Sequence, residues 1–358
     1  MARALRLAAR GLYTTTPNPR VGCVIVKDGA VVGEGWHERA GGPHAEIVAL
    51  QAAGASSKSG ARGATLYVTL EPCHHHGRTP PCDEALIAAG VKRVVVALRD
   101  PDPRTAEQGI EHLRRAGIEV ETGVLENEAR ELNSGFMSRL TRGRPWVRVK
   151  LAASLDGKTA LSNGNSRWIT GEAARRDGHR WRARACAILT GSGTVNADDP
   201  QLTVREVETP RQPLRVVVDS HLGILPAARI LEGGGVLVVC ANDDRSKSDR
   251  LRGQGAEVIA LPNSQGKVDL PELLNELARR EINELHVEAG ATLNGALLEA
   301  GLADELLLYF APCVLGAGAR GMFDLPPLND LGARHNLRIQ DMRMVGSDLR
   351  MLARLERK

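Results

Sequence analysis

Short apolar runs alternate with amphipathic stretches along the first third of the chain. Runs rich in β-branched residues, typical of buried strands, cover residues 21–26, 64–70, 93–98 and 118–123. Apolar residues at helical spacing over residues 5–12 predict a first helix, and further helices begin near residues 43, 83 and 105, with Asp83 where an N-cap residue is expected. This alternation predicts an α/β/α sandwich.

The rest of the chain continues the alternation. Strands are predicted at residues 146–152, 186–190, 214–218, 236–240, 257–261, 285–288 and 305–311, with a closing hairpin at 337–345 and 350–355. Long helical stretches cover residues 172–184 and 270–281. The pattern predicts a second α/β domain with a mostly parallel sheet. A polar, breaker-rich segment at 141–145 leads us to expect domains at residues 1–143 and 146–358.

The composition favours a two-domain cytoplasmic enzyme that acts on small molecules. With 358 residues the chain is long for a single hydrophobic core. Its formal net charge is only +4, whereas nucleic-acid binding usually needs a concentrated basic surface. Six cysteines in so long a chain do not indicate a disulfide framework, and no apolar run is long enough to span a bilayer. We therefore expect neither a nucleic-acid partner nor a membrane anchor.

One part of the chain carries the donor set of a zinc enzyme. His44 and Glu46 precede Cys73 and Cys82, and Cys73 follows a strand-like run. One imidazole and two thiolates leave the fourth position of a tetrahedral zinc site open for water, as in zinc enzymes that deaminate nucleobases. Glu46 would then transfer protons as general acid and base. A purely structural zinc site is the alternative, with a fourth ligand from His74, His75 or His76.

A glycine-rich segment in the second half predicts a phosphate-binding loop. Residues 287–296 run from a predicted strand through Gly290 into a predicted helix, whose first backbone N–H groups could hold a phosphate or pyrophosphate. Residues 316–321 match the dinucleotide fingerprint G-x-G-x-x-G, but Pro326 and Pro327 prevent the helix that this motif requires. We therefore interpret residues 316–321 as a turn.

Taken in order along essentially the whole chain, these segments resemble the family of bifunctional deaminase/reductases of riboflavin biosynthesis. The resemblance rests on residues 16–22, 44–46 and 71–82 in the first half and on residues 150–158, 165–170, 197–200 and 288–290 in the second. Eight residues separate the two cysteines, as in this family, whereas nucleic-acid and nucleoside deaminases typically have two. A nucleoside or nucleic-acid deaminase with an accessory domain is the alternative.

For the first domain the resemblance implies a cytidine-deaminase-like fold and hydrolytic deamination of 2,5-diamino-6-(ribosylamino)pyrimidin-4-one 5′-phosphate. Zn²⁺ held by His44, Cys73 and Cys82 would activate water, and Glu46 would be the catalytic proton carrier. The residues implied in substrate binding are Asn18, His37, His75 and Arg78.

For the second domain the resemblance implies a dihydrofolate-reductase-like α/β fold that reduces the ribosyl group to ribityl with NADPH. The implied cofactor site consists of Ala152, Trp168, Thr194, Asp198, Ser220, Gly290, Ala291, Thr292, Leu293, Asn294, Gly295 and Ala296. The implied substrate site consists of Ser166, Arg182, Leu202, Arg205 and Glu288, with Lys150 as a catalytic residue near the sugar. The resemblance also implies a homo-oligomer formed through this domain.

Several of these assignments have plain structural alternatives. Arg78 could be a surface charge, and the glycine-rich loop could be only a tight turn. Trp168 could be a core residue, and Lys150 could be an ordinary charge on an edge strand. The helix around Arg182 is rich in arginine and could be a solvated face. The sequence leaves these alternatives open.

Overall fold

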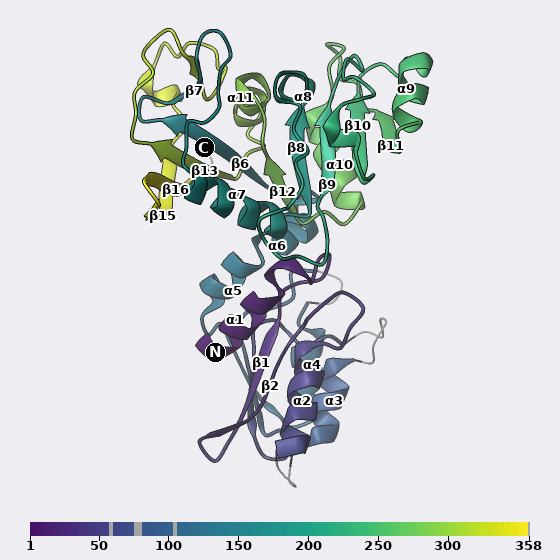
Figure 1. The fold of residues 1–358 in the computed structure, drawn as a ribbon. Helices are drawn as coiled ribbons and strands as arrows, with labels where there is room; N and C mark the ends of the chain where they lie inside the picture. Colours follow the sequence, from purple (N-terminus) through teal and green to yellow (C-terminus); the bar gives the residue numbers. More distant parts are fainter. Residues whose placement is uncertain (57–59, 75–80, 103–105, 357–358) are drawn as a thin grey trace. The chain divides into compact units, whose positions relative to one another are not determined.

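The chain forms two compact units, Met1–Gly143 and Arg144–Lys358, each built on its own sheet (Figure 1). The structure is a computed structural model, and it describes residues 1–56, 60–74, 81–102 and 106–356. Within those ranges, no helix is both long enough and apolar enough to cross a membrane. Each unit is described below by itself.

The first unit contains a five-stranded sheet in the order β2-β1-β3-β4-β5. Strand β1 pairs antiparallel with β2 and β3, whereas β3, β4 and β5 are parallel to one another. The strands span Gly22–Lys27 (β1), Ala30–Trp36 (β2), Thr65–Val68 (β3), Arg93–Val96 (β4) and Glu119–Thr122 (β5). The four strands predicted from the sequence are therefore confirmed, and β2 is an addition.

Strand β2 was missed because two glycines interrupt its apolar pattern. A Cβ atom at Gly33 would lie 2.3 Å from the carbonyl oxygen of Ala49, and one at Gly35 would lie 2.5 Å from that of Ala45. Both alanines belong to helix α2 (Ala45–Ser56). The glycines thus allow α2 to approach the strand backbone closely, a use of glycine that lowers the strand signal in the sequence.

Helices cover both faces of this sheet. Helix α1 (Ala2–Ala8) packs on the face that carries Val24, while α2 packs on the face that carries Cys23 and Ile25. The remaining helices are α3 (Cys82–Ala89), α4 (Gln108–Arg115), α5 (Glu126–Leu132) and α6 (Ser134–Arg142), with a 3₁₀ turn at Ala9–Tyr13. The predicted α/β/α sandwich is confirmed. The helix start expected near residue 105 lies outside the described residues, and α4 is assigned from Gln108.

The predicted role of Asp83 as an N-cap was wrong. Helix α3 begins one residue earlier, at Cys82, and its N-cap is Pro81. Asp83 is the second helical residue, and its side chain is fully buried. Its carboxylate binds two histidines, which are described further below.

The second unit contains a nine-stranded sheet in the order β11-β10-β9-β8-β12-β6-β13-β16-β15. All pairings from β11 to β13 are parallel, and β16 and β15 close the sheet as an antiparallel hairpin. The mostly parallel sheet and the C-terminal hairpin are confirmed. The strands span Trp146–Ser154 (β6), Ala187–Gly191 (β8), Leu214–Val218 (β9), Val236–Cys240 (β10), Ala256–Ala260 (β11), Glu284–Val287 (β12), Glu305–Ala311 (β13), Leu337–Val345 (β15) and Asp348–Leu355 (β16).

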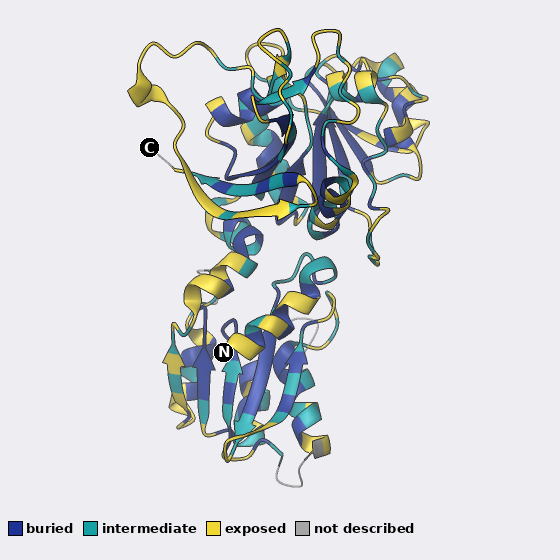
Figure 2. Cartoon of the chain, turned by 60° about the vertical axis from the view of Figure 1, so that its left-hand side comes forward, coloured by how far each residue is buried: buried dark blue, intermediate teal, exposed yellow. Residues whose placement is uncertain are grey.

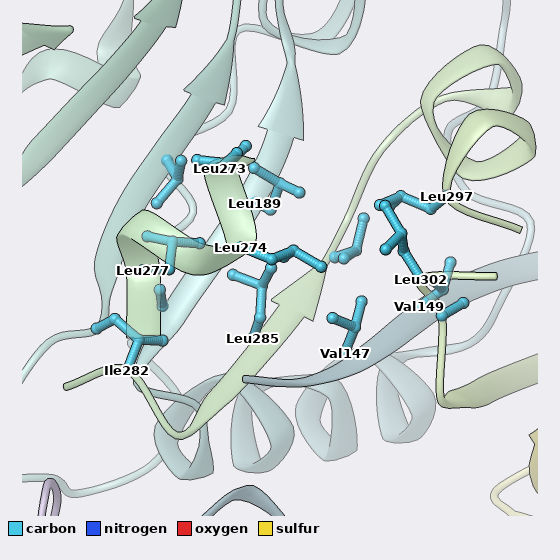
Figure 3. Close-up of a cluster of buried hydrophobic side chains, with 14 of the residues drawn as sticks. Val147, Val149, Leu189, Leu273, Leu274, Leu277, Ile282, Leu285, Leu297 and Leu302 are labelled. Carbon is cyan, nitrogen blue, oxygen red and sulfur yellow. The ribbon is translucent and has the colours of Figure 1, made fainter. Parts of the chain in front are cut away.

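A large apolar core holds this sheet to its helices. Figure 3 shows Val147 of β6, Leu189 of β8 and Leu285 of β12 facing Leu274 and Leu277 of helix α10. Full burial of each such side chain stabilises the unit by about 1.5–3 kcal/mol. The helices are α7 (Glu172–Arg184), α8 (Ser192–Asp198), α9 (Arg245–Arg252), α10 (Leu270–Arg279) and α11 (Ala291–Glu299), with 3₁₀ turns at Arg229–Leu231 and Leu331–Ala333.

The second unit also contains a small separate sheet, in which β7 (Lys158–Ala160) pairs with β14 (Arg320–Gly321). Residues 316–319 form the turn before β14, and no helix directly follows the segment, as expected. Figure 2 shows the outer strand β15 as largely exposed, in contrast to the buried strands in the middle of the sheet.

Candidate functional site

The three predicted zinc ligands converge in the first unit. His44 immediately precedes α2, Cys73 lies in the segment after β3, and Cys82 begins α3. The Nδ1 atom of His44 lies 3.2 Å from the sulfur of Cys82 and 3.5 Å from that of Cys73. All three donor atoms lie within 4.8 Å of one another. One imidazole nitrogen and two sulfurs at this spacing match the donor set that zinc prefers.

Electrostatics in this cluster favour a thiolate and a carboxyl group that titrates near neutral pH. Hydrogen bonding with Cys82 and with His44 lowers the pKa of Cys73 to about 4. Glu46, one residue into α2, is only 3 % exposed, and burial raises its pKa to about 7. A carboxyl group with such a pKa can both accept and return a proton at neutral pH.

Two predicted substrate residues, His37 and Asn18, are hydrogen-bonded to each other, and the His37 ring contacts that of His44. The ring of His37 stands edge-on to that of His44, with centroids 5.4 Å apart. Its Nδ1 atom lies 3.0 Å from the carbonyl oxygen of Pro43, which can only accept, so Nδ1 carries the proton. Its Nε2 atom therefore accepts from the Nδ2 atom of Asn18, 3.0 Å away. Burial also lowers the pKa of His37, which favours this neutral tautomer. The other two, His75 and Arg78, lie outside the described residues.

A buried carboxylate holds the segment that leads to Cys73, and sequence reasoning gave it no role. Glu71 is 6 % exposed and accepts hydrogen bonds from the backbone N–H groups of Asp100, Glu107 and Ile110. A Cβ atom at Gly109 would lie 2.0 Å from the carbonyl oxygen of Pro72, so glycine is required for this close contact. The position of Glu71, two residues before a ligand, was the available signal.

In the second unit, three predicted residues form one partly buried ionic cluster beside the carboxyl end of β12. Arg182 of α7 donates from Nη2 to Oε2 of Glu288 over 3.0 Å, and the Nζ atom of Lys150 lies 3.9 Å from the same oxygen. Glu288 directly follows β12, which pairs with β6, the strand that carries Lys150. Ligands of open α/β sheets bind at such strand ends.

The charges in this cluster depend on one another. Burial alone would raise the pKa of Glu288, but the Arg182 and Lys150 cations hold it well below its usual range. Burial lowers the pKa of Lys150, although Glu288 opposes that shift. The alternative of an edge-strand charge is wrong for Lys150, because β6 lies between β12 and β13.

The predicted phosphate loop has the expected form. Strand β12 leads through Gly290 into α11, which contains Ala291, Thr292, Leu293, Asn294, Gly295 and Ala296. A Cβ atom at Gly290 would lie 3.7 Å from the Thr194 hydroxyl oxygen, so the starts of α8 and α11 lie close together. Asn294 and Gly295 face inward: Asn294 is fully buried, and a Cβ atom at Gly295 would lie 2.1 Å from the Asp324 carbonyl oxygen. The exposed backbone at the start of α11 is therefore the part that can meet a ligand.

Trp168 is an exposed ring, so the core-residue alternative is wrong. Its relative exposure is 71 %, and the guanidinium of Arg175 lies 4.6 Å from the ring centroid. The neighbouring Arg167 lies 3.9 Å from the carboxylate of Asp198. The arginine-rich helix is only partly a solvated face, because Arg182 and Arg184 turn inward to Glu288 and Glu284.

The other predicted residues of this unit differ in how far they are buried. Ala152 lies half-buried in β6, Ser166 is half-buried, and Ser220 follows β9 and accepts from the backbone N–H of Val268 over 3.2 Å. Arg205 is exposed. Leu202 is only 4 % exposed and packs in the core, so its backbone alone could meet a ligand.

Sequence reasoning missed His286, which lies beside the ionic cluster. It is fully buried in β12, and its Nε2 atom lies 3.5 Å from Oε1 of Glu288. Burial lowers its pKa, so the imidazole is neutral at pH 7. A histidine two residues before a candidate site carboxylate, on the same strand face, was the available signal.

These two sites define a zinc-type deaminase domain joined to a reductase domain, and comparison with known proteins agrees. Residues 1–98 match the family "Cytidine and deoxycytidylate deaminase zinc-binding region", and residues 145–351 match "RibD C-terminal domain". The chain is 49 % identical to the riboflavin biosynthesis protein RibD of Escherichia coli K12, over 98 % of this chain and 96 % of that protein.

Solved structures give the same result. RibD of Acinetobacter baumannii superposes with a TM-score of 0.91 at 44 % identity, covering 99 % of this chain and 98 % of that one. A deaminase/reductase of Thermotoga maritima superposes with a TM-score of 0.88 at 36 % identity, covering 99 % and 97 %. The chain therefore belongs to the RibD family of bifunctional deaminase/reductases in riboflavin biosynthesis. The alternative of a nucleoside or nucleic-acid deaminase is not supported.

Proposed function

We propose that the first unit deaminates 2,5-diamino-6-(ribosylamino)pyrimidin-4-one 5′-phosphate and that the second reduces the ribosyl group of the product to ribityl. The observation that carries the proposal is the convergence of His44, Cys73 and Cys82 beside the buried Glu46. The Thermotoga maritima relative is named as a deaminase of diaminohydroxyphosphoribosylaminopyrimidine and a reductase of 5-amino-6-(5-phosphoribosylamino)uracil, which supports this choice of substrates.

In the first unit, His44, Cys73 and Cys82 would hold Zn²⁺, which supplies an activated water when bound. Glu46 would take a proton from that water and deliver protons to the ring nitrogen and the leaving amine. Its pKa of about 7 suits both directions of transfer. Asn18, with its amide fixed by His37, would bind the edge of the pyrimidine. Ammonia is released, and an oxygen replaces the 2-amino group.

In the second unit, NADPH would bind with its phosphates at the start of α11 and supply a hydride. Arg182 fixes the Glu288 carboxylate, and Glu288 in turn holds the Lys150 ammonium beside the end of β12. Lys150 would orient and polarise the sugar as its C1′ atom is reduced. The exposed Trp168 ring and Thr194 offer a surface and a hydroxyl for the cofactor.

Two further expectations belong to this proposal. The enzyme would act in the cytoplasm, and it would form a homo-oligomer through its second unit. Sedimentation of the full chain beside a chain ending at residue 143 would test the oligomer, because only the full chain should self-associate.

The proposal is tested by giving the zinc-loaded protein the diaminopyrimidine phosphate and following ammonia release with and without NADPH. Absorbance of the reduced nicotinamide is recorded in parallel. We expect ammonia without the cofactor and oxidation of NADPH only after deamination. No ammonia from the zinc-loaded protein would refute the deaminase assignment, and ammonia without any oxidation would refute the assignment of the second unit.

A further inference from the structure

A second cluster of possible metal ligands lies in the first unit, separate from the His44, Cys73 and Cys82 set. It consists of His74, Asp83 and His112, whose donor atoms all lie within 4.8 Å of one another. The Nδ1 atom of His74 is 2.6 Å from Oδ2 of Asp83, and the Nδ1 atom of His112 is 2.7 Å from the same oxygen. The two imidazole rings meet edge to face, with centroids 4.7 Å apart.

Burial sets this cluster apart from an ordinary surface group of acids and histidines. The Asp83 side chain is fully buried, whereas those of His74 and His112 are 37 % and 34 % exposed. Within the described ranges, the Asp83 carboxylate has as polar partners the two imidazoles and the backbone N–H of Glu84. A buried carboxylate is stable only when a cation or several hydrogen bonds compensate it. Here the groups that face it are both good metal ligands.

We propose that His74, Asp83 and His112 bind a second divalent transition-metal ion, in a site independent of the three-residue thiolate set. Two imidazole nitrogens and one carboxylate oxygen suit Zn²⁺, Co²⁺ or Ni²⁺ and leave coordination positions for water. A recess of about 350 Å³, lined in part by His74, Glu107 and Glu111, gives the ion a path from solvent.

An ion at this site would connect three segments of the first unit. His74 directly follows Cys73, Asp83 directly follows Cys82, and His112 lies on α4. An ion held by all three would link both cysteine-bearing segments to a helix that contributes nothing to the thiolate set. The second ion would therefore fix the positions of two zinc ligands without touching the reacting atoms.

The test is a titration of the metal-free full-length protein with Co²⁺, followed by optical absorption and by equilibrium dialysis with metal analysis. We expect two ions per chain, of which only one produces thiolate-to-cobalt charge-transfer absorption. His112→Gln keeps an amide that can donate to Asp83 but removes an imidazole ligand, so it should bind one ion with the thiolate band unchanged. His335→Gln, an exposed histidine of the other unit, is the matched control and should still bind two.

Saturation of the wild-type protein at one ion per chain, with the thiolate band complete, would overturn the proposal and leave a hydrogen-bonded His–Asp–His cluster. Two ions per chain in folded His112→Gln would also overturn it. If that variant does not fold, crystals of the wild-type protein soaked in Zn²⁺ decide the question. An anomalous peak between the two imidazoles and Asp83 is expected, and a map with a peak only at the cysteines contradicts the site.

Discussion

The two candidate sites are assembled in opposite ways. In the first unit, the starts of α2 and α3 and the segment after β3 supply short motifs, with Glu46 two residues from His44 and Cys82 nine residues from Cys73. In the second unit, Lys150, Arg182 and Glu288 come from β6, α7 and the end of β12, and 138 positions separate the first from the last. The parallel pairing of β6 and β12 brings Lys150 to Glu288, and Arg182 reaches the same carboxylate from α7.

This difference determines what each site can tolerate. A metal site gathers its ligands around one strong centre, so loss of one ligand removes the function of the whole site. An ionic cluster on a rigid sheet is held by the core around it, so each charge can be altered separately, at a cost that depends on its neighbours. The predictions below separate the two sites by these criteria.

Removal of the metal should have the largest effect. Chelation of the zinc, or His44→Ala, should lower deamination by more than about 10⁴-fold, because no activated water is then supplied. The rate at which NADPH reduces the already deaminated pyrimidine should stay within about twofold of wild type, because changes at distant, independent sites have little effect on one another. Steady-state rates with each substrate measure both. A parallel loss of reductase activity would show that the second site is not independent.

The second-largest effect is expected for Glu46→Gln. The amide retains the shape of the side chain but cannot carry a proton, so deamination should fall by about 10²–10⁴-fold. Zinc content, measured on the same samples, should be unchanged, which separates proton transfer from metal loss. The exposed Glu128→Gln is the matched control and should be as active as wild type. Full activity in Glu46→Gln would remove this residue from the reaction.

Lys150→Gln should affect only the second site, which would distinguish the two activities. Loss of the ammonium should lower the reductase kcat by about 10²-fold, the magnitude typical of one lost electrostatic contact to the reacting group. The Kd for NADPH should change little, because the phosphates bind at the start of α11, and deamination should be unaffected. Lys267→Gln, at an exposed position, is the control. A kcat equal to wild type would leave Lys150 a structural charge only.

The smallest expected effect is on how the stability of the second unit depends on pH, through His179. Burial, together with Arg182 and Arg205, lowers the pKa of His179 to about 4, while Glu288 and Glu206 oppose the shift. Its Nδ1 atom accepts from the backbone N–H of Arg205 over 3.3 Å, so the folded state favours the neutral ring. The unfolded chain binds the proton more readily, so stability present above about pH 6.5 is lost as the pH falls towards 4.

Denaturant unfolding of the second unit at several pH values measures this loss. Between pH 6.5 and 4 the free energy of unfolding should fall both in wild type and in His179→Gln. The fall in His179→Gln should be smaller than that in wild type by on the order of 1–2 kcal/mol. The exposed His221→Gln should follow the wild-type curve. Identical pH dependence in all three proteins would contradict the assignment of a buried neutral His179.

The sequence predicted most of the architecture because the strands are short, apolar and regularly spaced. It missed β2, because Gly33 and Gly35, which let helix α2 approach the strand backbone closely, interrupt the apolar pattern of that strand. It placed Asp83 as an N-cap, because nothing in the order of residues shows that His74 and His112 will converge on that carboxylate. The zinc motif could be recognised locally, whereas the approach of Lys150 to Glu288 depends on the register between β6 and β12.

One measurement tests the central claim of two independent sites most directly. Glu46→Gln and Lys150→Gln are each assayed for ammonia release and for NADPH oxidation, and then mixed in equal amounts with the diaminopyrimidine phosphate and NADPH. We predict that the first variant oxidises NADPH only when given the deaminated pyrimidine, that the second releases ammonia but reduces poorly, and that the mixture completes both steps. Loss of both activities in either folded variant, or a mixture that does not complete the sequence, would contradict two separate sites.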